Sequence, residues 1–181
     1  NLILPCVRRA GWTDTQITRE HPLIAGTVIA PGGISRFLGS GFADIVLEAT
    51  PGTPVAVIEA KHKGRTPEDA IQQAIRYAQQ MDVPLAYGTN GSRIIERNLR
   101  TGIEREVSEF AAPAAAWAEY VSLHALDEAS AGLIAQPFNR NRLTSHGDVM
   151  IPRQYQVTAI NRVLSAIARG QQRVLLLMAT G

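Results

Sequence analysis

The pattern of apolar and polar positions predicts an α/β fold in which a mixed sheet is flanked by helices. Residues 42–49 and 54–61 are rich in β-branched and other apolar side chains, as buried central strands are. The turn-prone pair Pro51-Gly52 lies between them and predicts an antiparallel hairpin. Shorter runs predict further strands at residues 16–23 and 93–98, and one that begins with residues 84–87 and is ended by Asn90-Gly91. Pro31-Gly32-Gly33 predicts a turn between two short strands.

Apolar residues at helical spacing predict helices around this sheet. Residues 66–81 begin with a Thr-Pro pair, which supplies an N-cap and a proline at the first helical position, and acidic residues follow in the first turn. Residues 1–10 have the pattern of the end of a helix, closed by Gly11. Residues 113–135 are Ala-rich and mostly helical in pattern.

The pattern changes near the end of the chain. Residues 136–151 are polar and have no periodicity, so they are interpreted as a linker. After them, residues 152–169 have the pattern of an amphipathic helix and residues 173–178 that of a buried strand. We therefore expect a first domain over residues 1–135 and the start of a second domain over residues 152–181.

Composition and charge exclude several classes of protein. The chain has 181 residues, of which 45% are hydrophobic and 19% charged, values typical of an ordinary globular protein. Cys6 is the only cysteine, which excludes an intramolecular disulfide and favours the cytoplasm, and no apolar run predicts a membrane span. The net charge is only +2, so a nucleic-acid surface would have to be a local patch.

Acidic and basic side chains lie at the ends of the two central strands. If Pro51-Gly52 centres a tight turn, Asp44 faces Glu59, with Cβ atoms about 5 Å apart. Two carboxylates that close repel each other unless a cation lies between them, and Mg²⁺ prefers such oxygen ligands. Lys61 projects from the same face as Glu59, where it can orient or help to deprotonate a water. An exposed Glu-x-Lys is otherwise commonly a solvated strand face, but these charges lie at the ends of buried strands, where they are costly.

The Asp…Glu-x-Lys arrangement resembles the PD-(D/E)xK nuclease signature. The resemblance is closer to the restriction (R) subunit of type I restriction enzymes. Four segments follow in the order of that family, namely Ala43–Leu47, Val57–Lys61, Gln73–Ala78 and Pro84–Gly91. Ala43 stands where the name of the superfamily has proline, and an acid that many relatives carry in the first helix would lie upstream of Asn1.

The resemblance implies a magnesium-dependent endonuclease that hydrolyses double-stranded DNA. Asp44, Glu59 and the carbonyl of Ala60 would bind Mg²⁺, and Lys61 would assist the attacking water. The family also implies two partners, a methyltransferase (M) subunit and a sequence-recognition (S) subunit. The substrate would be foreign DNA that lacks a protective methyl mark.

Other residues could border such a site. Gln73 and Tyr77 are one helical turn apart, and the resemblance implies that they position DNA or support the lysine. The alternative is that Tyr77 belongs to the core and Gln73 to the surface. Arg36, Lys63 and Arg65 could contact phosphates, although solvated loops are nearly as good an interpretation.

The last segment resembles the beginning of a RecA-like motor domain. Arg153-x-x-Gln156 is similar to an adenine-recognition segment, and the strand before Thr180 and Gly181 is similar to the approach to a phosphate-binding loop. A capped amphipathic helix with a surface glutamine is the alternative for Gln156. Because the chain has no initiating methionine and ends at Gly181, we expect it to be a piece of a longer, ATP-driven protein and not to hydrolyse ATP itself.

Two other functions remain open at this point. The first is the nuclease module of a DNA-repair helicase–nuclease, which would differ in motor motifs beyond Gly181. The second is a nuclease fold that cuts nothing and docks the motor to DNA or to partner subunits.

Overall fold

The computed structural model describes residues 3–23, 26–29, 35–38, 40–62, 64–136, 142–143, 145–147, 149–150 and 152–175. The helices are α1 (Ile3–Arg9), the 3₁₀ turn η1 (Asp14–Gln16), α2 (Pro67–Met81), α3 (Pro113–Leu123), α4 (Glu128–Ala135) and α5 (Gln154–Ala168). The strands are β1 (Ile17–Leu23), β2 (Gly26–Ile29), β3 (Ser35–Leu38), β4 (Gly41–Thr50), β5 (Thr53–Ala60), β6 (Leu85–Thr89), β7 (Ile94–Asn98), β8 (Glu104–Val107), β9 (Arg142–Leu143) and β10 (Val149–Met150).

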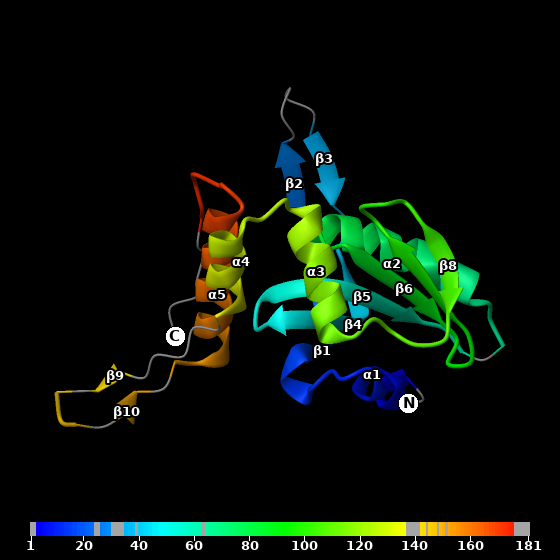
Figure 1. Ribbon diagram of the computed structural model, residues 1–181, viewed down its shortest axis with the longest axis horizontal. Helices are drawn as coiled ribbons and strands as arrows, with labels where there is room; N and C mark the ends of the chain where they lie inside the picture. Colours follow the sequence, from blue (N-terminus) through cyan, green and yellow to red (C-terminus); the bar gives the residue numbers. More distant parts are fainter. Residues whose placement is uncertain are drawn as a thin grey trace.

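A mixed six-stranded sheet forms the centre of the molecule (Figure 1). Its strand order is β1-β4-β5-β6-β7-β8, and β5 and β6 are parallel whereas the other neighbours are antiparallel. The predicted α/β class is therefore confirmed, and β1 lies at an edge as expected. The turn predicted at Pro31-Gly32-Gly33, between β2 and β3, lies outside the described residues.

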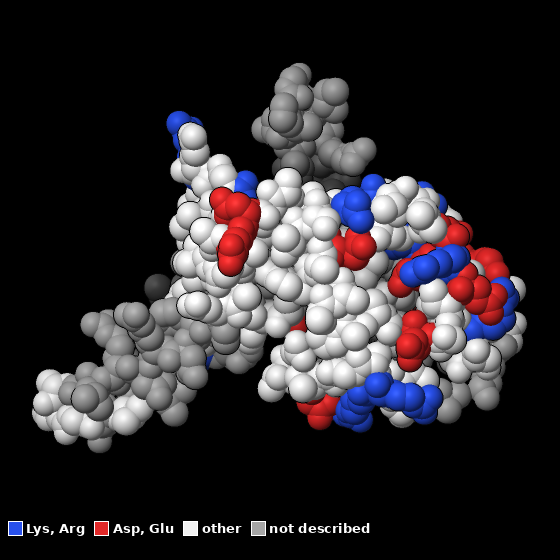
Figure 2. All heavy atoms as spheres, in the orientation of Figure 1, with Lys and Arg blue, Asp and Glu red and all other residues white. Residues whose placement is uncertain are grey.

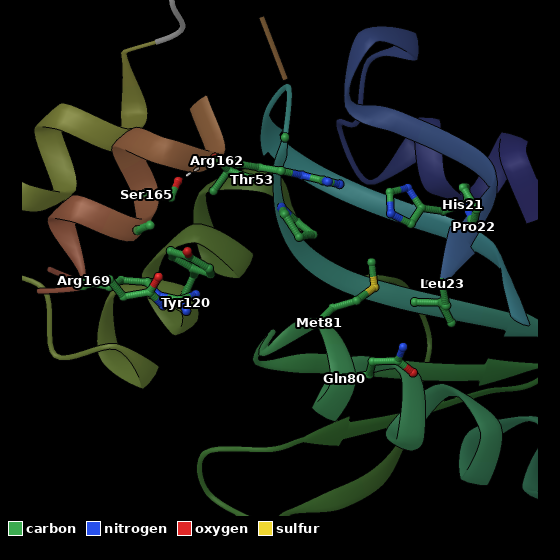
Figure 3. A pocket seen from close by; sticks show the side chains of 14 residues that line it. His21, Pro22, Leu23, Thr53, Gln80, Met81, Tyr120, Arg162, Ser165 and Arg169 are labelled. Carbon is green, nitrogen blue, oxygen red and sulfur yellow. Dashed lines mark hydrogen bonds between the residues drawn. The ribbon is translucent and has the colours of Figure 1, made fainter. Parts of the chain in front are cut away.

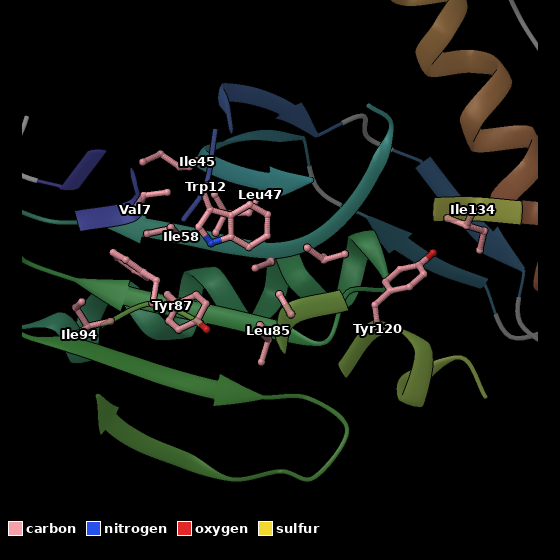
Figure 4. Close-up of a cluster of buried hydrophobic side chains, with 14 residues drawn as sticks. Val7, Trp12, Ile45, Leu47, Ile58, Leu85, Tyr87, Ile94, Tyr120 and Ile134 are labelled. Carbon is pink, nitrogen blue, oxygen red and sulfur yellow. The ribbon is translucent and has the colours of Figure 1, made fainter. Parts of the chain in front are cut away.

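Each face of the sheet packs against different helices, as Figure 1 shows for α2 and α3. On one face Val46 and Val57 pack with Ile71 and Ala74 of α2. On the other face the core is built from the second set of alternating strand residues together with α1, α3 and α4. Figure 4 shows this second core, in which Trp12 lies beside Leu47. Both faces are thus buried, which explains why the central strands read as nearly continuous apolar runs.

The β4–β5 hairpin has the register that its turn predicts. Ile45 pairs with Ile58 and Val46 with Val57, and Gly52 adopts φ +86° in the turn. Such a left-handed backbone conformation favours glycine. The hairpin therefore brings the residues at the open ends of β4 and β5 next to each other.

Helix α5 packs against the six-stranded sheet and the helices α1–α4 around it, which together are called the sheet domain. Asn161 Nδ2 donates a hydrogen bond of 2.8 Å to the Pro51 carbonyl, and the hydroxyls of Thr53 and Ser165 lie 3.3 Å apart. A Cβ on Gly52 would lie 2.7 Å from the carbonyl oxygen of Thr158, so the helix touches the hairpin turn directly. Figure 1 shows α5 alongside α4.

The structure differs from prediction after α5. Residues 173–175, expected to begin a buried strand, are in no strand, and Leu175 is 82% exposed. An isolated apolar segment has no neighbouring strand to satisfy its backbone, which accounts for the difference. The rest of that predicted strand lies outside the described residues. Within the predicted linker, β9 and β10 form a two-residue antiparallel pair. Among the helices described, none is long and apolar enough to cross a membrane.

Candidate active site

The open end of the β4–β5 hairpin brings Asp44 and Glu59 together. The backbone N–H of Asp44 donates to Glu59 Oε1 over 3.1 Å, and the N–H of Ala60 donates to Asp44 Oδ2 over 2.8 Å. These reciprocal hydrogen bonds fix both carboxylates against the neighbouring strand. Glu59 is 1% exposed, whereas Asp44 is open to solvent. The pair thus has one buried and one accessible acid.

The surroundings of Glu59 disfavour its negative charge. Burial and the neighbouring Asp44 raise the pKa of Glu59 to about 7, although the Asp44 N–H, Lys61 and Arg76 act in the opposite direction. Two acids in contact in a partly desolvated site therefore create a strong demand for positive charge.

Lys61 supplies one positive charge and is held in place by helix α2. Its Nζ donates a hydrogen bond of 3.0 Å to Gln73 Oε1, and Gln73 Nε2 donates to the Tyr77 hydroxyl over 3.1 Å. The Lys61 backbone N–H continues the β5–β6 pairing by donating to the Thr89 carbonyl over 2.9 Å. The five residues predicted as catalytic therefore lie next to one another in the structure. They are Asp44, Glu59, Lys61, Gln73 and Tyr77. Tyr77 is half-buried and hydrogen-bonded, so it is not simply a core residue.

Two glycines that were not predicted as site residues allow α2 to lie close to the strands of the site. Gly88 pairs with Glu59 across β5 and β6, and a Cβ there would lie 2.6 Å from the Pro67 carbonyl and collide with the backbone of Ile71. Gly41 similarly leaves room for the Tyr77 hydroxyl, which would lie 2.7 Å from an added Cβ. A lone glycine inside a predicted strand is a known sign of close backbone approach, and Gly88 carried that signal.

The donor set suits a hard divalent cation. Asp44 and Glu59 each use one carboxylate oxygen in a backbone hydrogen bond, and the second oxygen of each has no hydrogen-bond partner among the described residues. Mg²⁺ is normally bound by one or two carboxylates together with waters and phosphate oxygens. No group of three or more His, Cys, Asp or Glu side chains is arranged to hold a metal within the described part of the chain. The predicted ligands are instead two carboxylates and the backbone carbonyl of Ala60.

The proposed phosphate-contacting residues are only partly placed. Arg65 is exposed before α2, and its carbonyl accepts a hydrogen bond of 3.2 Å from Asn90 Nδ2. Arg36 belongs to β3, but its side chain, like the whole of Lys63, lies outside the described residues. On the face drawn in Figure 2, acidic and basic side chains are interleaved near β8, where Arg93 pairs with Glu106 at 2.8 Å. That part of the surface is therefore charge-balanced and not a basic patch.

The residues predicted to contact ATP lie at the other end of the described chain. The Arg153 backbone N–H donates to Gln156 Oε1 over 2.9 Å, so the Gln156 side chain caps the start of α5. Thr180 and Gly181 lie outside the described residues.

Comparison with known proteins gives two informative matches. Over 99% of its length, the chain is 36% identical to the endonuclease subunit of the type I restriction enzyme EcoAI from Escherichia coli. Its structure matches a solved fragment, assigned to the HsdR subunit of a type I restriction enzyme from Vibrio vulnificus YJ016, with a TM-score of 0.65 and 29% identity over 99% of the chain. The chain spans 22% of the first protein and 33% of the second. No protein-family model matches it.

Proposed function

Because this chain is homologous over almost its whole length to the endonuclease subunits of type I restriction enzymes, we propose that it is the nuclease-bearing part of such a subunit. Its reaction is the hydrolysis of phosphodiester bonds in double-stranded DNA. The observation that carries this proposal is the contact of Asp44 and Glu59 at the end of a hairpin, with Lys61 directly after the strand that carries Glu59.

Each residue of the site has a separate role in the proposed reaction. Asp44, Glu59 and the carbonyl of Ala60 would hold Mg²⁺, which when bound supplies positive charge to the phosphate and lowers the pKa of a water. The Lys61 ammonium, oriented by Gln73, positions that water and stabilises the negative charge that develops on the phosphate. Glu59 is screened from solvent, so its interaction with a cation is stronger than at an exposed site.

The proposal extends to the whole protein of which such a nuclease forms part. Residues 1–135 are assigned to the nuclease, residues 136–151 to a linker, and residues 152–181 to the start of an ATP-driven translocase. Arg153, Gln156, Thr180 and Gly181 would contribute to its ATP site. The partners are a methyltransferase subunit and a specificity subunit, and the substrate is double-stranded DNA.

Cleavage of plasmid DNA by the assembled enzyme tests the nuclease assignment. Asp44→Asn and Lys61→Ala are expected to reduce the cleavage rate by at least about 100-fold, because each removes charge at the reacting phosphate. Glu109→Gln, at an exposed acid away from the hairpin end, is the matched control and should cut at the parent rate. Thermal denaturation checks that all three variants fold.

Binding of Mn²⁺ by calorimetry provides a second readout that does not depend on activity. The parent chain and Lys61→Ala should bind the ion, and Asp44→Asn should not. If folded Asp44→Asn and Lys61→Ala enzymes cut as fast as the parent, the fold serves as a docking module and the nuclease assignment is wrong.

A further inference from the structure

A cavity of about 370 Å³ lies between α5 and the sheet domain (Figure 3). Its walls come from β1, the β4–β5 turn, the end of α2, α3 and α5. Its volume falls within the range of small-molecule binding sites.

The lining of this cavity is cationic. Arg162, Arg169 and His21 line it, and no acidic side chain of the described residues does. Arg169 is held by an ion pair of 3.1 Å with Asp82. Arg162 is exposed and has no ion pair among the described residues, and Figure 3 shows it extending across the cavity toward His21.

One buried acid lies within electrostatic reach of Arg162. Glu48 is 7% exposed and does not line the cavity, and it forms no ion pair with Arg162. Burial and Arg162 both lower the pKa of His21, so Arg162 is the lining cation that has no ion pair within the described part of the chain. A site of this kind attracts an anion.

The cavity has walls from both faces of the sheet, since Tyr120 belongs to the core opposite α2, and it reaches the edge strand β1. Leu23 lines it and also belongs to the core that packs against α2, and α2 supplies the Gln73 that holds Lys61. His21 pairs with Ala43, the residue immediately before Asp44. The His21 wall of the cavity and the acid pair are therefore neighbours along the β1–β4 ladder.

The remaining walls suit the uncharged parts of a nucleotide. Leu23, Pro54 and Met81 provide apolar surface, and the Gln80 and Gln171 side chains lie beside it. A sugar or base edge can pack on such surface while its phosphate meets a guanidinium.

We propose that this cavity binds a phosphate group of the nucleic-acid strand that reaches Asp44 and Glu59, with Arg162 as the contacting cation. The proposal rests on the proposed nuclease function, which supplies the strand. A free nucleotide carries the same phosphate chemistry and is the alternative source of the ligand.

The salt dependence of DNA binding tests this contact. Fluorescence anisotropy with a short labelled duplex, in Ca²⁺ so that binding is followed apart from cleavage, gives the slope of log affinity against log salt concentration. Arg162→Gln should reduce the magnitude of this slope by about 0.9 and weaken binding roughly fivefold, because one phosphate contact is lost. Arg162→Lys keeps a positive charge and should retain the slope.

Arg9→Gln is the matched control. Arg9 is an exposed arginine of α1, which packs on the opposite face of the sheet, so its replacement changes the net charge equally but should leave the slope unchanged. A parallel titration with adenosine monophosphate tests whether the cavity binds a free nucleotide instead of DNA. Nucleotide binding that depends on Arg162, together with an unchanged DNA slope, would overturn the DNA assignment and leave a free-nucleotide site.

An Arg162→Gln chain that binds both duplex and nucleotide like the parent would overturn the proposal altogether. Failure of the nuclease assignment is recognised separately, by Lys61→Ala and Asp44→Asn enzymes that cleave at the parent rate. The contact in the cavity is tested by the difference in slope between Arg162→Gln and the parent, in which Lys61 is unchanged.

Discussion

Lys61 depends on a single side chain for its orientation. Gln73 accepts its hydrogen bond, whereas Gln72, one residue earlier, is exposed on α2. Gln73→Ala should therefore lower the cleavage rate of the assembled enzyme by about tenfold, the effect of a lost hydrogen bond to a charged group. Gln72→Ala removes the same amide group without touching Lys61 and should cut at the parent rate. Equal rates for the two variants would show that Gln73 does not position the lysine.

Glu59 gives the folded chain a pH dependence in the absence of metal. Its pKa is raised from 4.5 to about 7, so the folded state binds a proton more tightly than the unfolded state does. The free energy of unfolding should fall as pH rises from about 4.5 to about 7, by on the order of 3 kcal/mol. Denaturation in a chelating buffer measures this, and added Mn²⁺ should restore the lost stability above pH 7.

Glu59→Gln identifies the group responsible for this pH dependence. The variant should be more stable than the parent above pH 7, and the difference should vanish below about 4.5. Glu106→Gln is a suitable control, because Arg93 lowers the pKa of Glu106 and any effect of that group is lost only under acidic conditions. A pH profile that is the same for Glu59→Gln and the parent would contradict the assignment.

At the scale of elements, Gly88 sets the distance between α2 and the sheet. A methyl group at this position meets backbone atoms of α2, which cannot move out of the way as a flexible side chain can. Gly88→Ala should lower the free energy of unfolding by about 1–3 kcal/mol and should also lower the cleavage rate, because α2 carries Gln73. Gly132→Ala, in α4, has nothing within 4 Å of the new methyl group.

Gly132→Ala should be stabilising by about 0.5–1 kcal/mol, since it replaces glycine within a helix. Thermal or urea denaturation measures both glycine variants. If Gly88→Ala were as stable and active as the parent, the tight contact between α2 and β6 would not be needed for the site.

The central elements could be predicted from sequence because each has a local signal. Alternating faces and the Pro51-Gly52 turn determine that Asp44 meets Glu59, and helical spacing determines that Gln73 and Tyr77 share a face. What sequence could not give is the distance between α2 and the sheet. That distance depends on tertiary packing between Gly88, in the strand that follows α2, and the first turn of the helix, which no local sequence pattern reports.

Strand β8 and the break between α3 and α4 were missed for identifiable reasons. Strand β8 consists mainly of charged residues at the edge of the sheet, so it has no apolar alternation to predict it. The predicted helix over residues 113–135 is two helices, because Ala125 has φ +48° and Asp127 caps α4 by accepting a 2.7 Å hydrogen bond from the Ser130 N–H. The aspartate was a readable N-cap signal.

At the scale of the whole molecule, α5 is fastened to the sheet domain by polar contacts. Asn161 is 4% exposed and donates to the Pro51 carbonyl. Asn161→Ala should lower the unfolding free energy of the sheet domain by about 1–3 kcal/mol, because the carbonyl of the half-buried Pro51 loses its partner. The loss should appear as a lower denaturant midpoint.

Arg162→Ala is the control on the same helix. Arg162 is exposed, and its replacement should change stability by no more than about 0.5 kcal/mol. If Asn161→Ala left the midpoint unchanged, α5 would behave as part of a separate unit that contributes nothing to the stability of the sheet domain.

The β4–β5 hairpin carries the acid pair at its open end and meets α5 at its turn. The two strands are paired and buried on both faces, so they move as a rigid body and not as independent chains. A tilt of α5 would therefore reach Asp44 and Glu59 through the length of the hairpin. Movement of α5 would displace the two acids together and leave the spacing between them unchanged, so it would change how the pair is aimed and not its internal geometry.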